Sequence, residues 1–137
     1  MRYLVPVGRF FYSAIFLMTA LGHFSQQYIG YAAQQGVPAA GLLVPLSGVI
    51  ATAGGLSVAL GYQAKIGAWL LVLFLVPVTL MMHNFWAVTD PTMHGMQLAM
   101  FMKNVSMLGG ALLITHFGAG PLSLDARLPA RSAPGED

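Results

Sequence analysis

The chain contains no cysteine, and only 7% of its 137 residues are charged. The absence of cysteine excludes disulfides, thiolate metal sites and cysteine-based redox catalysis. In an average soluble domain about a quarter of the residues are charged, so the scarcity of charge, together with 57% hydrophobic residues, indicates a membrane protein. The net charge of +2 comes from scattered basic residues, and it gives no reason to expect a nucleic-acid partner.

The few charges are separated by long apolar runs. Charge-free runs cover residues 10–64, 66–89 and 104–124. A membrane-spanning helix needs about 20 mainly apolar residues. The sequence therefore predicts an all-α membrane protein, with four transmembrane helices in a compact bundle embedded in a lipid bilayer. These helices are expected over about residues 7–28, 40–60, 66–87 and 97–117, with Pro77 bending the third. Residues 118–137 are predicted to form a poorly ordered cytoplasmic tail.

Positive charges fall on one side of this four-span arrangement. The residues on that side are Arg2, Arg9, Lys65, Arg127 and Arg131. Cytoplasmic loops of membrane proteins carry an excess of Lys and Arg. Both termini are therefore predicted to be cytoplasmic, in a multi-pass protein.

The most polar groups within the spans are predicted to lie at a similar depth. A Lys well inside a bilayer costs about 2.5 to 3.5 kcal/mol and normally faces the bundle interior with a partner. At 1.5 Å per residue, Lys103 lies roughly 8 to 10 Å below the outer surface. The five residues expected to line a ligand pocket in the outer half of the bilayer are Lys103, Asn104, His83, Asn84 and His23.

Three of these residues also have a purely structural interpretation. Lys103 can form an ion pair with Asp90, in the loop above it, instead of binding a ligand. His83 and Asn84 can cap the end of a helix. Two histidines at one depth, His23 and His83, are a weak indication of haem. Methionines at the start of the fourth helix suit Cu(I) but are also ordinary apolar filler. No metal site is therefore predicted, and neither haem nor copper is expected.

Short motifs follow one another in a fixed order along the chain. They are Gly8-Arg9, Gly22-His23-Phe24, Gly36-Val37-Pro38, Ser47-Gly48, Gly54-Gly55-Leu56, His83-Asn84-Phe85-Trp86, and Lys103-Asn104 with Gly109-Gly110. In their order and spacing the chain resembles the DoxX family of small four-helix bacterial inner-membrane proteins. It departs from that family at His23, where many members have Lys, and at Ala51, where many have Glu.

This resemblance implies a membrane subunit of a quinone-linked oxidoreductase system in the bacterial inner (cytoplasmic) membrane. The five polar residues would then line a site for quinone or another small ligand. Because the chain offers no redox centre of its own, a partner protein would supply the electrons, and the chain would be at most an accessory subunit. The alternative is a non-enzymatic membrane scaffold or small-molecule carrier. A scaffold needs little more than the ridge of small residues at Ser47, Ala51, Gly55 and Ala59, which permits close helix packing.

Overall fold

The computed structural model describes residues 2–128, and it is helical throughout its regular structure. In chain order the elements are α1 (Leu4–Thr19), the 3₁₀ helix η1 (Ala20–Phe24), α2 (Gln26–Gln34), α3 (Ala40–Leu60), α4 (Ala64–Met82), the 3₁₀ helix η2 (Phe85–Ala87) and α5 (Pro91–Phe117). No strand occurs within residues 2–128. Four helical segments are long and apolar enough to cross a membrane, namely Leu4–Phe24, Ala40–Leu60, Ala64–Ala87 and Pro91–Phe117. The predicted four-span, all-α fold is confirmed, and the protein is a multi-pass membrane protein whose helices contact lipid.

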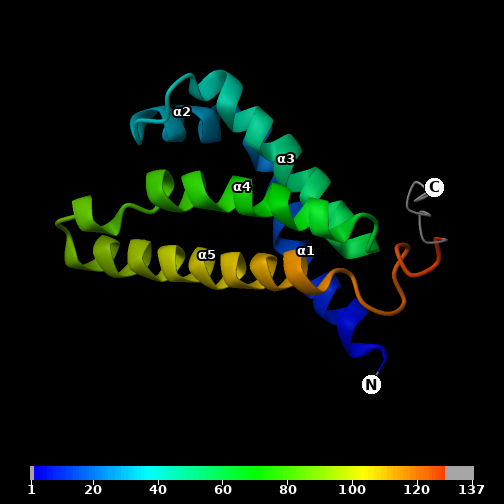
Figure 1. Ribbon diagram of the computed structural model, residues 1–137. Helices are drawn as coiled ribbons and strands as arrows, with labels where there is room; N and C mark the ends of the chain where they lie inside the picture. The colour runs from blue at the N-terminus through cyan, green and yellow to red at the C-terminus, as the bar shows by residue number, and fades with distance from the viewer. Residues whose placement is uncertain (1, 129–137) are drawn as a thin grey trace, which may run out of the picture.

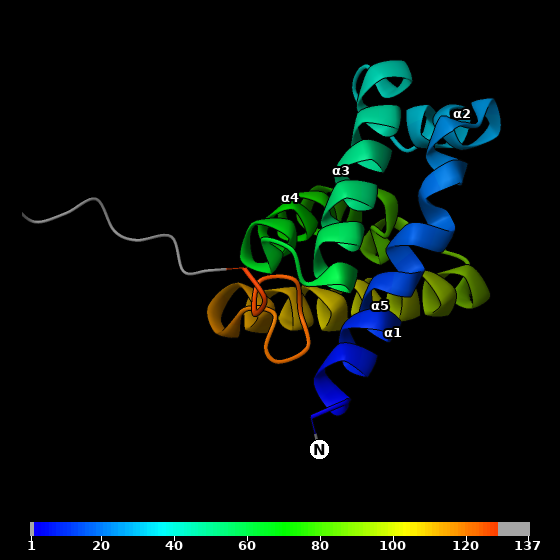
Figure 2. The same cartoon turned by 90° about the vertical axis from the view of Figure 1, so that its right-hand side faces the viewer.

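Helices α4 and α5 form an antiparallel hairpin, and α1 and α3 cross it (Figure 1, Figure 2). Helices α4 and α5 lie side by side, and α3 packs across α4 while also contacting α1 (Figure 1). Seen from the side, α1 crosses α5 obliquely and leads into α2, which folds against the start of α3 (Figure 2). The start of α1, the α3–α4 turn and the segment after α5 gather at one end of the molecule.

The core lies where α1, α3, α4 and α5 meet, and small residues bring the helices together. A Cβ added to Gly54 of α3 would lie 2.8 Å from the backbone oxygen of Gly67 in α4. A Cβ added to Gly55 would lie 3.1 Å from the side chain of Leu17 in α1. Close approach of this kind drives helix association in lipid, where burying apolar surface gains little. The core residues are Phe16, Ala51, Val58, Ala68, Leu71, Phe74, Leu75 and Ala111.

The first span ends earlier than the predicted 7–28, and the expected loop after it is helical. The α-helix stops at Thr19, passes through η1 and restarts as α2. Ser25 separates the two because its backbone is extended and its hydroxyl accepts a hydrogen bond from the Tyr28 N–H at 3.2 Å. The same hydroxyl donates to the Gly22 carbonyl at 2.8 Å. Serine is a strongly favoured N-cap, so this residue ends one helix and starts the next.

The fourth span starts at Pro91 rather than at residue 97, and α4 ends before η2. Asp90 is the N-cap of α5, since its Oδ1 accepts a hydrogen bond from the Met93 N–H at 2.8 Å. Proline is tolerated directly after the cap because no intrahelical partner exists for an N–H there. Pro77 lies inside α4, as predicted.

The segment after α5 is folded back onto the bundle, which corrects the predicted poorly ordered tail for residues 118–128. Arg9 of α1 donates from Nη1 to the Ala119 carbonyl and from Nη2 to the Leu122 carbonyl, the latter at 3.0 Å. Backbone N–H groups of Leu124 and Asp125 bond the carbonyls at the α3–α4 turn. Residues 129–137 of that predicted tail lie outside the described residues.

Candidate functional site

A cavity of about 260 Å³ opens between α2, α3 and α4. Its walls are almost entirely apolar, and its polar side chains are His23, Tyr28 and Ser47. Small-molecule sites are typically concave and mainly apolar, with a few polar groups that fix the ligand's orientation. An apolar cavity of about 150 Å³ already holds benzene, so this one has room for a larger ring or a short alkyl chain. The lining residues are His23, Tyr28, Ala32, Val37, Leu43, Val44, Leu46, Ser47, Ile50, Leu73, Phe74, Pro77, Val78, Met81 and Met82.

Three local features position the walls of this cavity. The break in the first span turns η1 inward, which buries His23 against α3. Gly48 makes that approach possible, because a Cβ on it would lie only 2.6 Å from the His23 Cβ. Pro77 lines the cavity from α4, where a proline removes one backbone donor and bends the helix.

The His23 ring is only 4% exposed and is held at a fixed orientation. Its Nδ1 lies 3.1 Å from the Thr19 carbonyl oxygen. A carbonyl oxygen can only accept, so Nδ1 carries the proton in this bond. The ring also packs against Tyr28 and Phe74, with centroids at 5.2 and 5.6 Å. The tautomer and the ring plane of His23 are therefore both set by the fold.

Tyr28 and Ser47 bring hydroxyl groups to the same cavity. The Ser47 hydroxyl donates to the Val44 carbonyl at 2.7 Å, so its hydrogen is already used within α3. Burial, and secondarily the neighbouring Tyr31, raise the pKa of the Tyr28 phenol above its ordinary value, which keeps the O–H neutral over a wide pH range. Of these two residues, Tyr28 is therefore the one whose O–H can donate to a ligand.

Several residues that line the cavity are also exposed on the outer surface of the bundle, among them Tyr28, at 42%, and three leucines. Leu43, Leu46 and Leu73 line the cavity and are also 40%, 47% and 59% exposed. They belong to α3 and α4, which are both spanning helices. Part of the cavity's rim therefore lies on the surface of the spanning helices.

Among the five predicted site residues, only His23 lines this cavity. His83 lies at the end of α4, and its Nδ1 is 2.9 Å from Oε1 of Gln97 in α5. Asn84 follows it, half-buried, and the Asn84 carbonyl accepts from the N–H of Ala87 in η2. Both residues therefore lie at the α4–α5 connection, and the helix-capping role considered for them stays a prediction.

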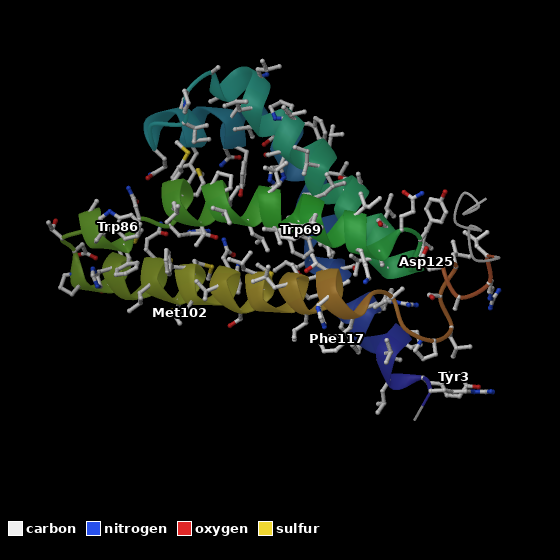
Figure 3. The ribbon with its side chains drawn as sticks, viewed as in Figure 1. Tyr3, Trp69, Trp86, Met102, Phe117 and Asp125 are labelled. Carbon is white, nitrogen blue, oxygen red and sulfur yellow. The ribbon has the colours of Figure 1, made fainter. Side chains whose placement is uncertain are left out.

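Lys103 and Asn104 lie on different faces of α5, because adjacent helical residues are about 100° apart. Asn104 is buried, whereas Lys103 is exposed. Within residues 2–128, the hydrogen-bond contact of the Lys103 ammonium is a weak one to the Met100 sulfur at 3.6 Å. Much of α5 is open in the same way, and Met102 lies on its side away from α4 (Figure 3). The expected convergence of these five residues on one pocket is therefore not observed.

The expected ion pair between Asp90 and Lys103 is also absent from the described residues. Asp90 caps the first turn of α5 with its carboxylate. Thirteen residues of helix separate the two, which at 1.5 Å per residue is roughly 20 Å. The prediction was wrong because it placed Asp90 in a loop above the helix rather than at its N-terminus.

A second polar cluster, at the other end of the bundle, was not predicted from the sequence. Asp125 accepts hydrogen bonds from the backbone N–H groups of Gln63 at 2.6 Å and Ala64 at 3.1 Å, so it caps α4 from 61 residues away (Figure 3). Arg9, only 6% exposed, binds the neighbouring carbonyls of the same segment. Apart from Arg9 Nε, which is buried and has no hydrogen-bond partner within residues 2–128, the polar groups named here bond backbone groups, so we interpret this cluster as structural.

Comparison with known proteins assigns the chain to a family. The model of the SURF4 family matches residues 41–128. The chain belongs to the SURF4 family. The prediction of DoxX membership is thus wrong: the motifs that suggested it are mostly short glycine-containing pairs and triplets, which close helix packing also favours. The SURF4 match includes α3, α4, α5 and the docked segment, but it does not include His23 or Tyr28.

Two curated relatives are similar to this SURF4 family chain over different lengths. The ER-derived vesicles protein ERV29 of Saccharomyces cerevisiae is 33% identical over 79 residues, which are 58% of this chain and 25% of that protein. The chain thus spans about a quarter of ERV29. The inner membrane protein YqjF of Escherichia coli is 29% identical over 130 residues, which are 90% of this chain and 91% of YqjF. No solved structure matches the chain.

Proposed function

We propose that this chain is a non-enzymatic protein of the bacterial inner membrane that takes up an apolar small molecule from the bilayer into the α2–α3–α4 cavity. The observation that carries the proposal is the cavity itself, with apolar walls and a rim that includes exposed leucines. The inner-membrane location rests on the similarity to YqjF, which covers nearly the whole of both chains.

The proposal of binding and not catalysis rests on the apolar walls of the cavity and on the small number of polar side chains that line it. One nitrogen of His23 is already engaged by the Thr19 carbonyl, and the Ser47 hydrogen is engaged by the Val44 carbonyl. These groups are well suited to orient a ligand, and within residues 2–128 no cluster of metal-ligating side chains adjoins them.

A quinone-linked role is the second candidate, and it rests on the same cavity. His23 beside Phe74 and Tyr28 would border a flat ring. Lys103, Asn104 and His83, which were expected to complete a quinone site, do not line the cavity. We therefore rank quinone as one ligand to be tested and not as the function.

The test is ligand binding by the purified chain, with one substitution that fills the cavity and a matched one that does not. Val44, buried on α3, lines the cavity, whereas Val49, 53% exposed on the same helix, does not. We expect one molecule of 4-heptylphenol to bind the wild type and Val49→Phe, and none to bind Val44→Phe.

Native mass spectrometry is the suitable assay, because it separates bound ligand from ligand dissolved in detergent. Circular dichroism of each variant checks that the helices are intact. Equal binding by Val44→Phe, or no binding by the wild type, would overturn the proposal. A benzoquinone with a heptyl side chain, measured in the same way, tests the second candidate.

A further inference from the structure

We infer that the cavity selects ligands carrying a hydroxyl group, and that the hydroxyl lies at the His23–Tyr28 end. This inference rests on the proposed ligand-binding function and adds the chemical class of the ligand. It follows from counting which hydrogen-bond donors and acceptors the fold leaves available at the cavity.

The first available group is an acceptor on His23. In the tautomer whose single ring proton is donated from Nδ1 to the Thr19 carbonyl, Nε2 holds a lone pair and no hydrogen. Within residues 2–128, Nε2 makes no hydrogen bond, although the ring is almost completely buried. The fully buried side-chain N and O atoms without a partner in the described chain are Arg9 Nε and Ser13 Oγ, so His23 Nε2 keeps some accessible surface. A ligand that donates to this lone pair therefore gains a hydrogen bond.

The second and third groups are hydroxyls that differ in the hydrogen bonds they can still make. The Ser47 hydroxyl has spent its hydrogen on the Val44 carbonyl and retains only lone pairs. The Tyr28 hydroxyl makes no side-chain hydrogen bond within the described part of the chain, so it can both donate and accept. Acceptors therefore outnumber donors at this cavity, and Tyr28 supplies the donor.

A ligand hydroxyl complements this set better than a carbonyl or an ether. A hydroxyl can donate to His23 Nε2 while accepting from the Tyr28 O–H. The two rings are neighbours, with centroids 5.2 Å apart, and both line the cavity, so we place the ligand hydroxyl between them. A carbonyl or ether oxygen can satisfy only the Tyr28 donor and would leave Nε2 unpaired. The same reasoning favours a reduced hydroquinone over the corresponding quinone.

The experiment compares two ligands of nearly equal shape on the wild-type protein. The probes are 4-heptylphenol and its methyl ether, 4-heptylanisole, which keeps the oxygen but has no hydrogen to donate. We expect the phenol to bind about five- to tenfold more tightly, the ratio that corresponds to one net hydrogen bond. In His23→Phe, which keeps an aromatic ring between Tyr28 and Phe74, we expect this ratio to fall to about one.

The possible results separate the two proposals. Equal binding of both ligands by the wild type, abolished in Val44→Phe, overturns the hydroxyl preference and leaves the cavity as a binding site. Tighter binding of the ether overturns the preference as well. Binding of neither ligand removes the proposed function and the preference with it. If His23→Phe does not fold, the wild-type ratio still decides, and Ser47→Ala, which removes a different acceptor, should reduce that ratio by less than half.

Discussion

Removing the Asp125 carboxylate should release the C-terminal segment and weaken the start of α4. Gln63, the residue before this helix, has a left-handed backbone with φ of 47°, and its own side chain makes no capping hydrogen bond. The Asp125 carboxylate supplies the cap instead, with bonds of 2.6 and 3.1 Å to two backbone N–H groups. Asp125→Ala leaves both N–H groups without this partner.

The magnitude follows from the two contributions that the carboxylate makes. Loss of an N-cap costs about 0.5 to 2 kcal/mol. Loss of a negative charge at a helix N-terminus costs a further 0.3 to 1 kcal/mol, roughly. We therefore expect Asp125→Ala to lower the free energy of unfolding by about 1 to 3 kcal/mol. Asp125→Asn keeps one side-chain oxygen as an acceptor, so it should lose about half as much.

The assay combines thermal unfolding in detergent with limited trypsin digestion. Release of residues 118–128 should speed cleavage after Arg127, an exposed residue in that segment. Asp90→Ala is the matched control, because Asp90 caps α5 locally and does not touch the segment. It should lower stability without changing cleavage at Arg127. If Asp125→Ala melts and is cleaved like the wild type, the long-range cap has no energetic role.

Three further predictions concern packing and charge. Gly48→Ala should lower the free energy of unfolding by about 1 to 3 kcal/mol, because the new methyl group overlaps His23. Gly41→Ala, in open space on the same helix, should not lower it. Equal melting temperatures for the two variants would contradict this. Burial raises the pKa of Tyr28 in the folded state, so its contribution to stability is complete below about pH 10 and is lost as the pH rises through that folded-state value. Tyr28→Phe should lack this alkaline loss in a stability titration, and an unchanged profile would refute it. Lys103→Met should leave the free energy of unfolding unchanged or raise it by up to about 3 kcal/mol, since the exposed ammonium has only a weak contact in the described chain. A clear loss of stability on thermal unfolding would show that Lys103 has a stabilising partner.

The number and type of the spanning helices were predictable from the sequence, and their ends were only partly so. Apolar length alone identifies four spans, because a bilayer requires about 20 apolar residues in each. The ends depend on single capping residues. Ser25 and Asp90 are both strong N-cap types, and Asp90 is followed by proline. The starts of α2 and α5 could therefore have been predicted from these residues, but the prediction used apolar length alone.

The site was harder to predict because the depth of a residue in the bilayer does not determine which neighbouring helix its side chain faces. Lys103 and Asn104 lie at nearly the same depth, but on a helix only one of two adjacent residues can face a given neighbour. The half-buried and buried positions Gln97, Phe101, Asn104 and Ala111 mark the side of α5 that packs inward. That side becomes evident only when the position of α4 is known. Ser47 and Tyr28 carry no distinctive motif, and they gain importance only through the cavity they share with His23.

The C-terminal segment was not predictable for a different reason. Arg9 and Ala119 are 110 residues apart, and each is unremarkable in its own sequence context. A basic residue near the start of a span is ordinarily explained by the positive-inside rule, which gives no reason to expect it to be buried. Its burial follows from the carbonyl groups that residues 118–128 bring to it.

The residues matched by the SURF4 model divide the molecule into two parts with different roles. The matched part, residues 41–128, contains α3, α4 and α5 together with Asp125, the cap that fixes the start of α4. It therefore supplies most of the apolar wall of the cavity. The polar end of the cavity, with His23 and Tyr28, comes from η1 and α2, outside the match.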